Sequence, residues 1–264
     1  MNIPTGADLR DTLTRSTTFG AWCVVPSALV AEGVAHAGFD WVCIDRQHGL
    51  IGYDAMVAMI QAVAITGTPA FVRVGENSPR EIGRTLDAGA AGVIVPMVNS
   101  VEDAERAVRA ARYPPAGERS WGPTRASFGR QGGGRPTEGL LLVMLETGAA
   151  FDRAESIASV EGVDGVFVGP ADLAVSLALE PHDVLDAEVV GRCKDLVRIC
   201  VRHGLIAGIG CHTVAQAQAW LTSGFRMISI GRDLTMLLDG LGGRLAAIRD
   251  LKPEGARLVL VDGE

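Results

Sequence analysis

The sequence predicts an α/β protein in which eight parallel strands close into a (β/α)8, or TIM, barrel. Eight short apolar segments alternate with longer segments of helical periodicity from end to end. Most of these apolar segments are continuous rather than alternating, as expected of parallel strands that helices cover on both faces. Eight β/α units in about 250 residues fit a closed barrel better than an open sheet. A doubly wound sheet is less favoured, because the first βα turn reads VVPSALV and lacks a Gly-rich dinucleotide fingerprint.

Each predicted element follows from local composition. The predicted strands are residues 19–25, 40–44, 69–74, 91–96, 140–146, 164–169, 205–210 and 226–231. Amphipathic helices are predicted at 53–65, 78–90 and 101–112. Glycine or aspartate precedes several strands, which is the turn chemistry expected between a helix and the next strand.

The whole chain, residues 1–264, is predicted to be one domain, with two segments that depart from the β/α alternation. Residues 113–139 are rich in Pro, Gly and Arg and are too long for a plain αβ loop, so they predict a lid or binding loop. The residues after Pro253 predict an extended arm or a frayed end.

Composition excludes several classes of partner. The formal net charge is −7 and the sequence pI about 5.3, which disfavours nucleic acid and anionic membranes. The five cysteines are scattered, without a C-x-x-C pair, and predict reduced thiols rather than disulfides or a zinc site. With no secretory signal and no apolar stretch of about 18–20 residues, a soluble cytoplasmic protein is expected.

Two acids at strand ends predict a metal site. Barrel enzymes carry their chemistry at the carboxyl ends of the strands. Glu146 ends the fifth predicted strand, and Asp172 follows the sixth within the segment GPADL. Carboxylate oxygens on adjacent strands suit a hard divalent ion. The alternative is that each acid only caps a following helix.

Arg73 and His48 are the other candidates for catalysis. Arg73 lies among apolar residues, where it would either pair with Glu146 or Asp45 or stabilise negative charge on a substrate oxygen; we favour the second role. His48, in the segment DRQHG after the second strand, is suited to proton transfer near neutral pH. Asp87 is a candidate partner for the second imidazole nitrogen, although an acid before Gly89 is also common at helix ends.

The segment GPADL predicts a binding turn for a carboxylate. Gly169 allows close approach of the backbone, and the N–H groups of Ala171 and Asp172 begin a helix. Together with a metal ion, an arginine and a histidine, this turn indicates enolate chemistry on a small 2-oxo acid.

These residues resemble the HpcH/HpaI family of metal-dependent (class II) pyruvate aldolases. The matching stretches lie within residues 9–250 and are AGFDWVCID, VRV, LDAGAAGVIVPMV, AVRAARYPPAGERS, LETGAA and VEGVDGVFVGPADL. The resemblance implies a barrel of the phosphoenolpyruvate/pyruvate-domain type and reversible aldol addition of pyruvate, or a related 2-oxo acid such as hydroxypyruvate, to an aldehyde.

The same resemblance implies roles for individual residues. Glu146 and Asp172 would bind Mg2+, Mn2+ or Co2+, without an organic cofactor. His48 would be the acid/base, with Asp87 as its partner, and Arg73 would stabilise the enolate. The backbone at residues 169–172 would bind the substrate carboxylate. A homohexamer built from dimers that exchange the last helix is also implied.

Two positions depart from the family pattern, and two other functions remain open. Gln47 replaces an acid in the D-x-E-H motif, and Met144 replaces a substrate-contacting Gln, which puts the preferred donor and acceptor in doubt. An acyl-CoA lyase of the malyl-CoA or citramalyl-CoA type would need a basic surface, for which residues 119–135 offer Arg119, Arg125, Arg130 and Arg135. A non-catalytic, carboxylate-binding barrel is the third reading.

Overall fold

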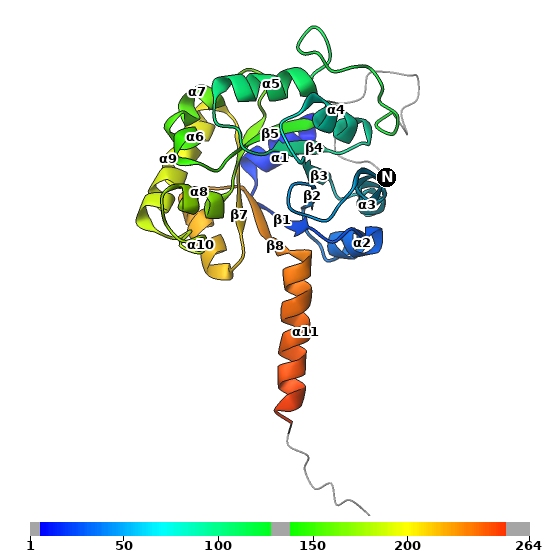
Figure 1. The fold of residues 1–264 in the computed structure, drawn as a ribbon, viewed down its shortest axis with the longest axis vertical. Coiled ribbons are helices and arrows are strands. Elements are labelled where there is room, and N and C mark those ends of the chain that lie inside the picture. The colour runs from blue at the N-terminus through cyan, green and yellow to red at the C-terminus, as the bar shows by residue number, and fades with distance from the viewer. Residues whose placement is uncertain (1–5, 128–137, 252–264) are drawn as a thin grey trace, which may run out of the picture.

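The predicted barrel is confirmed (Figure 1). The computed structural model describes residues 6–127 and 138–251, and in it eight parallel strands pair in chain order and close β8 onto β1. The strands are β1 Thr18–Cys23, β2 Trp41–Asp45, β3 Ala70–Arg73, β4 Gly92–Val95, β5 Leu140–Leu145, β6 Gly165–Val168, β7 Ile206–Cys211 and β8 Met227–Arg232. Each lies within one or two residues of its predicted bounds, because a buried apolar run is a strong signal for a strand.

Eleven helices are described, most of which cover the outside of the barrel. They are α1 Gly6–Arg15, α2 Ala28–His36, α3 Tyr53–Ile65, α4 Pro79–Asp87, α5 Val101–Ala111, α6 Gly148–Asp152, α7 Ala154–Ala158, α8 Pro170–Ser176, α9 Ala187–His203, α10 Val214–Ser223 and α11 Asp233–Arg249. Several begin at a Ser or Thr whose hydroxyl accepts a backbone N–H of the first turn, as at Ser78 and Ser100. None of the described helices is long and apolar enough to cross a membrane.

The barrel interior is packed, and α1 closes one end of it. Trp41, Phe71 and Phe167 form edge-to-face contacts inside the barrel. Leu9 and Leu13 of α1 are buried in the same cluster. The sequence analysis did not predict α1, because these two leucines are its only large apolar residues. The opposite end, where the strands terminate, is left for a binding site.

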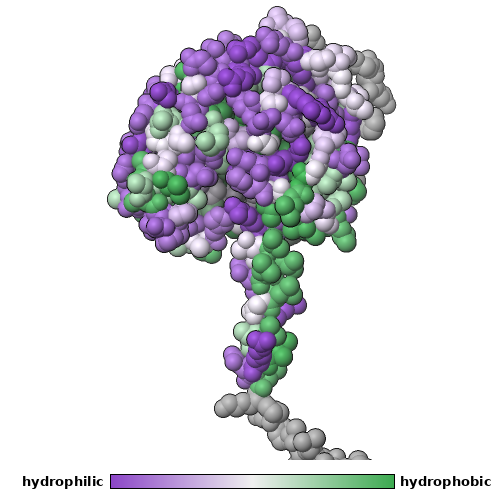
Figure 2. Space-filling model, viewed as in Figure 1, coloured by the Kyte–Doolittle hydropathy of each residue, from purple (hydrophilic) through white to green (hydrophobic). Residues whose placement is uncertain are grey.

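Helix α11 projects away from the barrel (Figure 1). Along one side of it runs an apolar stripe (Figure 2), which includes Leu237, Leu241, Leu245 and Ile248, each more than 45% exposed. We call these four residues the α11 stripe. A continuous exposed apolar stripe of this kind marks an interaction surface.

The described part of the segment 113–139 packs at the closed end of the barrel. Arg119 donates to Asp87 at the end of α4 (2.6 Å), and Arg125 donates to the carbonyl of Ala88 (3.2 Å). This position is opposite to the carboxyl ends of the strands, because α4 runs back from β3 toward the start of β4. Arg130 and Arg135, and the predicted arm after Pro253, lie outside the described residues.

Candidate active site

Arg73 and Asp45 form a buried ion pair at the ends of β3 and β2. The register of the two strands places them side by side. Arg73 donates from Nε to Oδ1 (2.9 Å) and from its terminal nitrogen NH2 to Oδ2 (2.6 Å) of Asp45, and both residues are at least 96% buried. Of the two roles considered for Arg73, pairing with Asp45 is therefore present. Its other terminal nitrogen, NH1, faces the sulfur of Met144 (3.9 Å), a weak acceptor, and keeps donors for a ligand.

Asp45 also organises the turn that carries His48. Its Oδ1 accepts the backbone N–H groups of Gln47 (3.0 Å) and His48 (3.3 Å). Burial alone would raise the pKa of Asp45, but hydrogen bonds from Arg73, Trp22 and the His48 backbone outweigh it and hold that pKa below its usual value. A Cβ at Gly49 would lie 2.2 Å from the carbonyl oxygen of Asp45, so this tight turn requires glycine.

Glu146 is held by the backbone of the neighbouring β4 loop. Its Oε1 accepts the N–H of Met97 (2.7 Å), a residue in the left-handed conformation (φ 55°). Glu146 does not cap the next helix, because the hydroxyl of Thr147 does so. Burial raises the pKa of Glu146, the N–H of Met97 opposes this, and the negative charge of Asp172 raises it further.

Glu146 and Asp172 have the chemistry of a two-carboxylate metal site. A Cβ on Gly169 would lie 2.8 Å from Oε2 of Glu146, so this oxygen sits directly beneath the GPADL turn. Asp172 is exposed in the first turn of α8. The two negative charges repel each other, and a bound cation would offset this repulsion. Within the described residues there is no cluster of three or more acidic, His or Cys ligands. A hard ion that keeps several waters fits such a pair.

A cavity of about 360 Å³ opens at the carboxyl ends of the strands. Four of the predicted site residues line it: Arg73, Gly169, Ala171 and Asp172. Trp22 and Phe167 form part of its apolar wall, with the Arg73 guanidinium 5.1 Å from the centre of the Trp22 ring. The structure thus gathers residues from β3 and the β6–α8 turn around one space.

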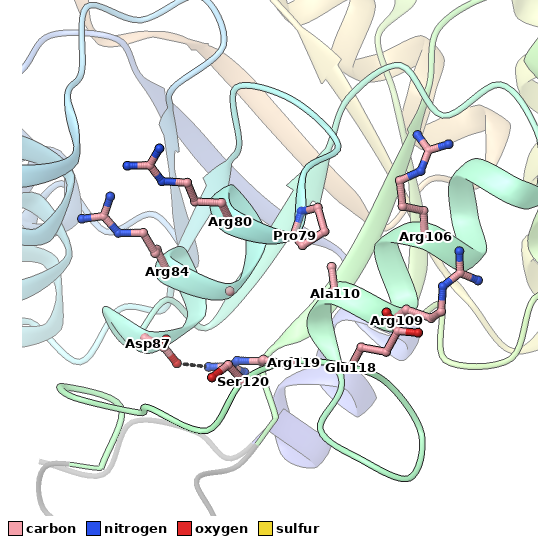
Figure 3. A pocket seen from close by; sticks show the side chains of 11 residues that line it. Pro79, Arg80, Arg84, Asp87, Arg106, Arg109, Ala110, Glu118, Arg119 and Ser120 are labelled. Carbon is pink, nitrogen blue, oxygen red and sulfur yellow. Dashed lines mark hydrogen bonds and ion pairs between the residues drawn. The ribbon is translucent and has the colours of Figure 1, made fainter.

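His48 and Asp87 are not brought together within one chain. His48 is exposed after β2, at the open end of the barrel. Asp87 lies at the far end of α4 and pairs with Arg119 (Figure 3). Asp87 and Arg119 border a second cavity, of about 460 Å³, which lies between α4 and α5. In Figure 3 the side chains of Arg80 and Arg84 extend away from α5.

Three residues of the cavity were not singled out from the sequence. They are His212 directly after β7, Gln216 in α10 and Arg232 at the end of β8. The search for metal ligands considered carboxylates at strand ends and passed over these three residues, although Asp233 directly follows β8. Position at a strand end was the signal that would have found His212 and Arg232.

A closed parallel barrel with acids and an arginine at its open end defines the class of the protein as a barrel enzyme, and comparison identifies the family. Residues 18–240 match the model of the HpcH/HpaI aldolase/citrate lyase family. The chain therefore belongs to this family. It is 38% identical to a hydroxypyruvate/pyruvate aldolase of Rhizorhabdus wittichii (82% of this chain, 88% of that protein). It is also 38% identical to a pyruvate aldolase of Rhizobium etli (91% and 96%). An HpcH/HpaI family protein of Burkholderia cenocepacia has a similar structure, with a TM-score of 0.83 at 29% identity (91% and 98%).

Proposed function

We propose that this protein is a class II pyruvate aldolase, a carbon–carbon lyase that reversibly adds pyruvate or a related 2-oxo acid to an aldehyde. The observation that carries the proposal is the gathering of Arg73, Gly169 and Asp172 around one cavity, with Glu146 beneath the turn. The two relatives described above are named a hydroxypyruvate/pyruvate aldolase and a pyruvate aldolase.

The metal requirement is part of the proposal. Glu146 and Asp172 would hold a divalent ion such as Mg2+, Mn2+ or Co2+, which when bound polarises a carbonyl oxygen. The acid pair supports this, because two adjacent carboxylates, one of them buried, are costly without a cation. No organic cofactor is proposed.

Arg73 would stabilise the negative charge that develops on the 2-oxo oxygen. Arg73 lines the cavity, and Asp45 fixes the plane of its guanidinium. A preformed donor of this kind is favourable in a site that excludes water. The backbone N–H groups at Ala171 and Asp172 would bind the carboxylate of the 2-oxo acid, since the first N–H groups of a helix lack intrahelical acceptors.

His48 would transfer the proton. In cleavage of a 4-hydroxy-2-oxo acid, the bond between C3 and C4 breaks, the C4 hydroxyl loses its proton, and C3 later gains one to form the methyl group of pyruvate. The exposed imidazole of His48 follows the strand next to that of Arg73. Because Asp87 lies at the closed end of the barrel, its pairing with His48 at the open end would require a second copy of the chain.

A homo-oligomer is proposed from α11, with a hexamer built from three dimers as the specific form. Gly240, Gly242 and Gly243 lie within this helix with no atoms near their Cβ positions. Each glycine costs about 1 kcal/mol of helix stability, so packing against another surface would stabilise α11. If two copies of the chain exchanged helix α11, the α11 stripe of each copy would be covered by the other copy. The variant Leu241→Glu should yield a smaller species in analytical ultracentrifugation, whereas Asp239→Lys, on the opposite side, should not.

Exchange of the pyruvate methyl protons with deuterium tests the proposed reaction. NMR should show exchange only with protein and an added divalent ion, and EDTA should stop it. The absence of exchange under all metal conditions would refute the aldolase. Carbon–carbon cleavage that requires a CoA thioester would instead support an acyl-CoA lyase. The positions of Arg119 and Arg125, both engaged at the closed end of the barrel, argue against that alternative.

A cytoplasmic location is also proposed. All five cysteines are free and buried, as expected in a reducing compartment.

A further inference from the structure

We propose that Arg46 and Glu81 are positioning residues for His48, because their ion pair holds the turn that carries the imidazole against α4. This inference rests on the proposed aldolase function, in which His48 transfers the proton. It concerns the outer side of the turn between β2 and α3, to which the proposed mechanism gives no role.

His48 depends on its backbone for its position. Across residues 6–127 and 138–251, its imidazole makes no hydrogen bond or ion pair, and the residue is exposed. Its backbone N–H, which donates to Oδ1 of Asp45 (3.3 Å), fixes it from within the turn. The place of the imidazole is therefore set by the groups that hold residues 46–50.

This turn is tied to both neighbouring strands. The N–H of Arg46 donates to the carbonyl of Arg73 at the end of β3 (2.9 Å), one step beyond the β2–β3 ladder. The N–H of Leu50 donates to the carbonyl of Val24 (3.2 Å), directly after β1. These bonds fix the two ends of the turn, and Asp45 holds its inner side.

The side chain of Arg46 joins the outer side of the turn to α4. Successive residues of a strand point to opposite faces, so Asp45 faces the barrel interior and Arg46 faces the outer helices. The NH1 group of Arg46 pairs with Glu81 in the first turn of α4, and these side chains are 14% and 22% exposed. The Nε of Arg46 is buried, and no described residue accepts its hydrogen. Glu81 is therefore the side-chain partner on which the outer side of the turn depends.

Helix α4 is a firm support at this point. The hydroxyl of Ser78 accepts the N–H of Glu81 (3.4 Å), and Ile82 is fully buried. An acid in the first turn is also favoured by the helix dipole. A displacement of Arg46 relative to this helix would move His48, two residues further on, relative to a substrate in the cavity.

The test compares cleavage of 4-hydroxy-2-oxopentanoate to pyruvate and acetaldehyde by wild-type protein, Glu81→Gln and Arg46→Lys. Glu81→Gln should lower kcat by about 10- to 100-fold, because misplacing a reacting group by about 1 Å can cost about 100-fold. KM and Mn2+ affinity should stay as in wild type, since the residues proposed to bind the donor and the metal ion stay in place. Arg46→Lys should keep most of the activity, because Arg46 uses one nitrogen atom to contact Glu81. Glu155→Gln, which breaks the ion pair with Arg202 between α7 and α9, is the matched control and should change neither constant.

A combination with His48→Ala is the decisive measurement. If Glu81 acts through His48, Glu81→Gln should lower kcat by less than about 2-fold in protein that already carries His48→Ala. An ion pair that only stabilises the fold would lower kcat by the same factor with and without His48.

Three results would overturn the assignment: equal losses with and without His48, an unchanged kcat in Glu81→Gln, or a rise in KM with kcat unchanged. If Glu81→Gln does not fold, Arg46→Met/Glu81→Leu, which buries no unpaired charge, takes its place with the same expectations. Deuterium exchange into pyruvate separates the two proposals. No exchange in wild-type protein would refute the aldolase, and with it the role of His48. Exchange in the wild type together with an unchanged kcat in Glu81→Gln would refute only the role of the ion pair.

Discussion

Replacing Asp45 with Asn should destabilise the protein strongly, although the two side chains have nearly the same shape. Asp45 is fully buried, and Arg73 is 4% exposed. The substitution leaves the guanidinium charge buried without its counter-ion and places an amide donor against an arginine donor. Loss of one partner of such a pair costs about 3–5 kcal/mol. For a domain of this size, that loss corresponds to a decrease in Tm of about 6–20 °C.

The measurement is urea denaturation of wild type, Asp45→Asn and Asp172→Asn, followed by circular dichroism. Asp172→Asn is the control, because its carboxylate is exposed and repelled by Glu146, so stability should not fall. A loss below about 1 kcal/mol in Asp45→Asn, typical of exposed pairs, would refute the reasoning. The double variant Asp45→Asn/Arg73→Met should recover stability, because it also removes the unpaired charge.

The effect of pH gives an independent check of the same pair. The folded-state pKa of Asp45 lies below its usual value of 3.8, so its stabilising contribution is present above pH 3.8 and disappears as the pH falls through the folded-state pKa. The stability difference between wild type and Asp45→Asn should be constant between about pH 5 and 8 and shrink below about pH 4. A difference that instead changes near neutral pH would assign the effect to another group.

The remaining predictions concern the metal site and the proton carrier. Because burial raises the pKa of Glu146 above its usual value, Mn2+ affinity measured by calorimetry should weaken as the pH falls toward that pKa, and Glu146→Gln should abolish binding without loss of stability near neutral pH. Binding that does not depend on pH would contradict this. Gly169→Ala would place a Cβ 2.8 Å from Oε2 of Glu146 and should lower Mn2+ affinity while the protein still folds; unchanged affinity would place the metal elsewhere. His48→Ala should lower cleavage by about 10²–10⁴-fold while Mn2+ affinity and the unfolding midpoint stay as in wild type; loss of Mn2+ binding would make His48 a ligand.

Much of the fold was predictable because burial dictates composition. A parallel strand covered on both faces must be apolar throughout, and all eight strands carry that signal. Helix α1 was missed because it buries only Leu9 and Leu13, too few for a periodic pattern. The apolar stripe of α11 resembles that of a helix packed on its own barrel, so this pattern alone does not show that the helix leaves the barrel; only the family resemblance implied a last helix exchanged between subunits.

The candidate site was predictable where one strand end decides a position, and less so where two elements meet. Glu146 and Asp172 were found from strand ends alone. The partner of Arg73 depends on the pairing of β2 with β3, which aligns Asp45 with Arg73 and excludes the choice of Glu146. The contact between Glu146 and Met97 depends on a left-handed residue after β4, and no local pattern signals that conformation at a methionine.

The positions of Asp45 at the open end of the barrel and Asp87 at its closed end decide which acid can assist His48. Asp45 uses both oxygens to fix Arg73 and the turn before His48, so it cannot also serve as the second-nitrogen partner of that imidazole. Asp87 is bound to Arg119 at the closed end of the barrel and can serve only from another copy. The exposed α11 stripe supplies a surface by which copies can associate. If Asp87 has the proposed role, the activity that depends on it should be lost when the oligomer is lost. Mixing inactive Asp87→Asn protein with inactive His48→Ala protein should restore activity at interfaces that contain one copy of each. Activity in dilute, monomeric protein would show that Asp87 and His48 do not act together.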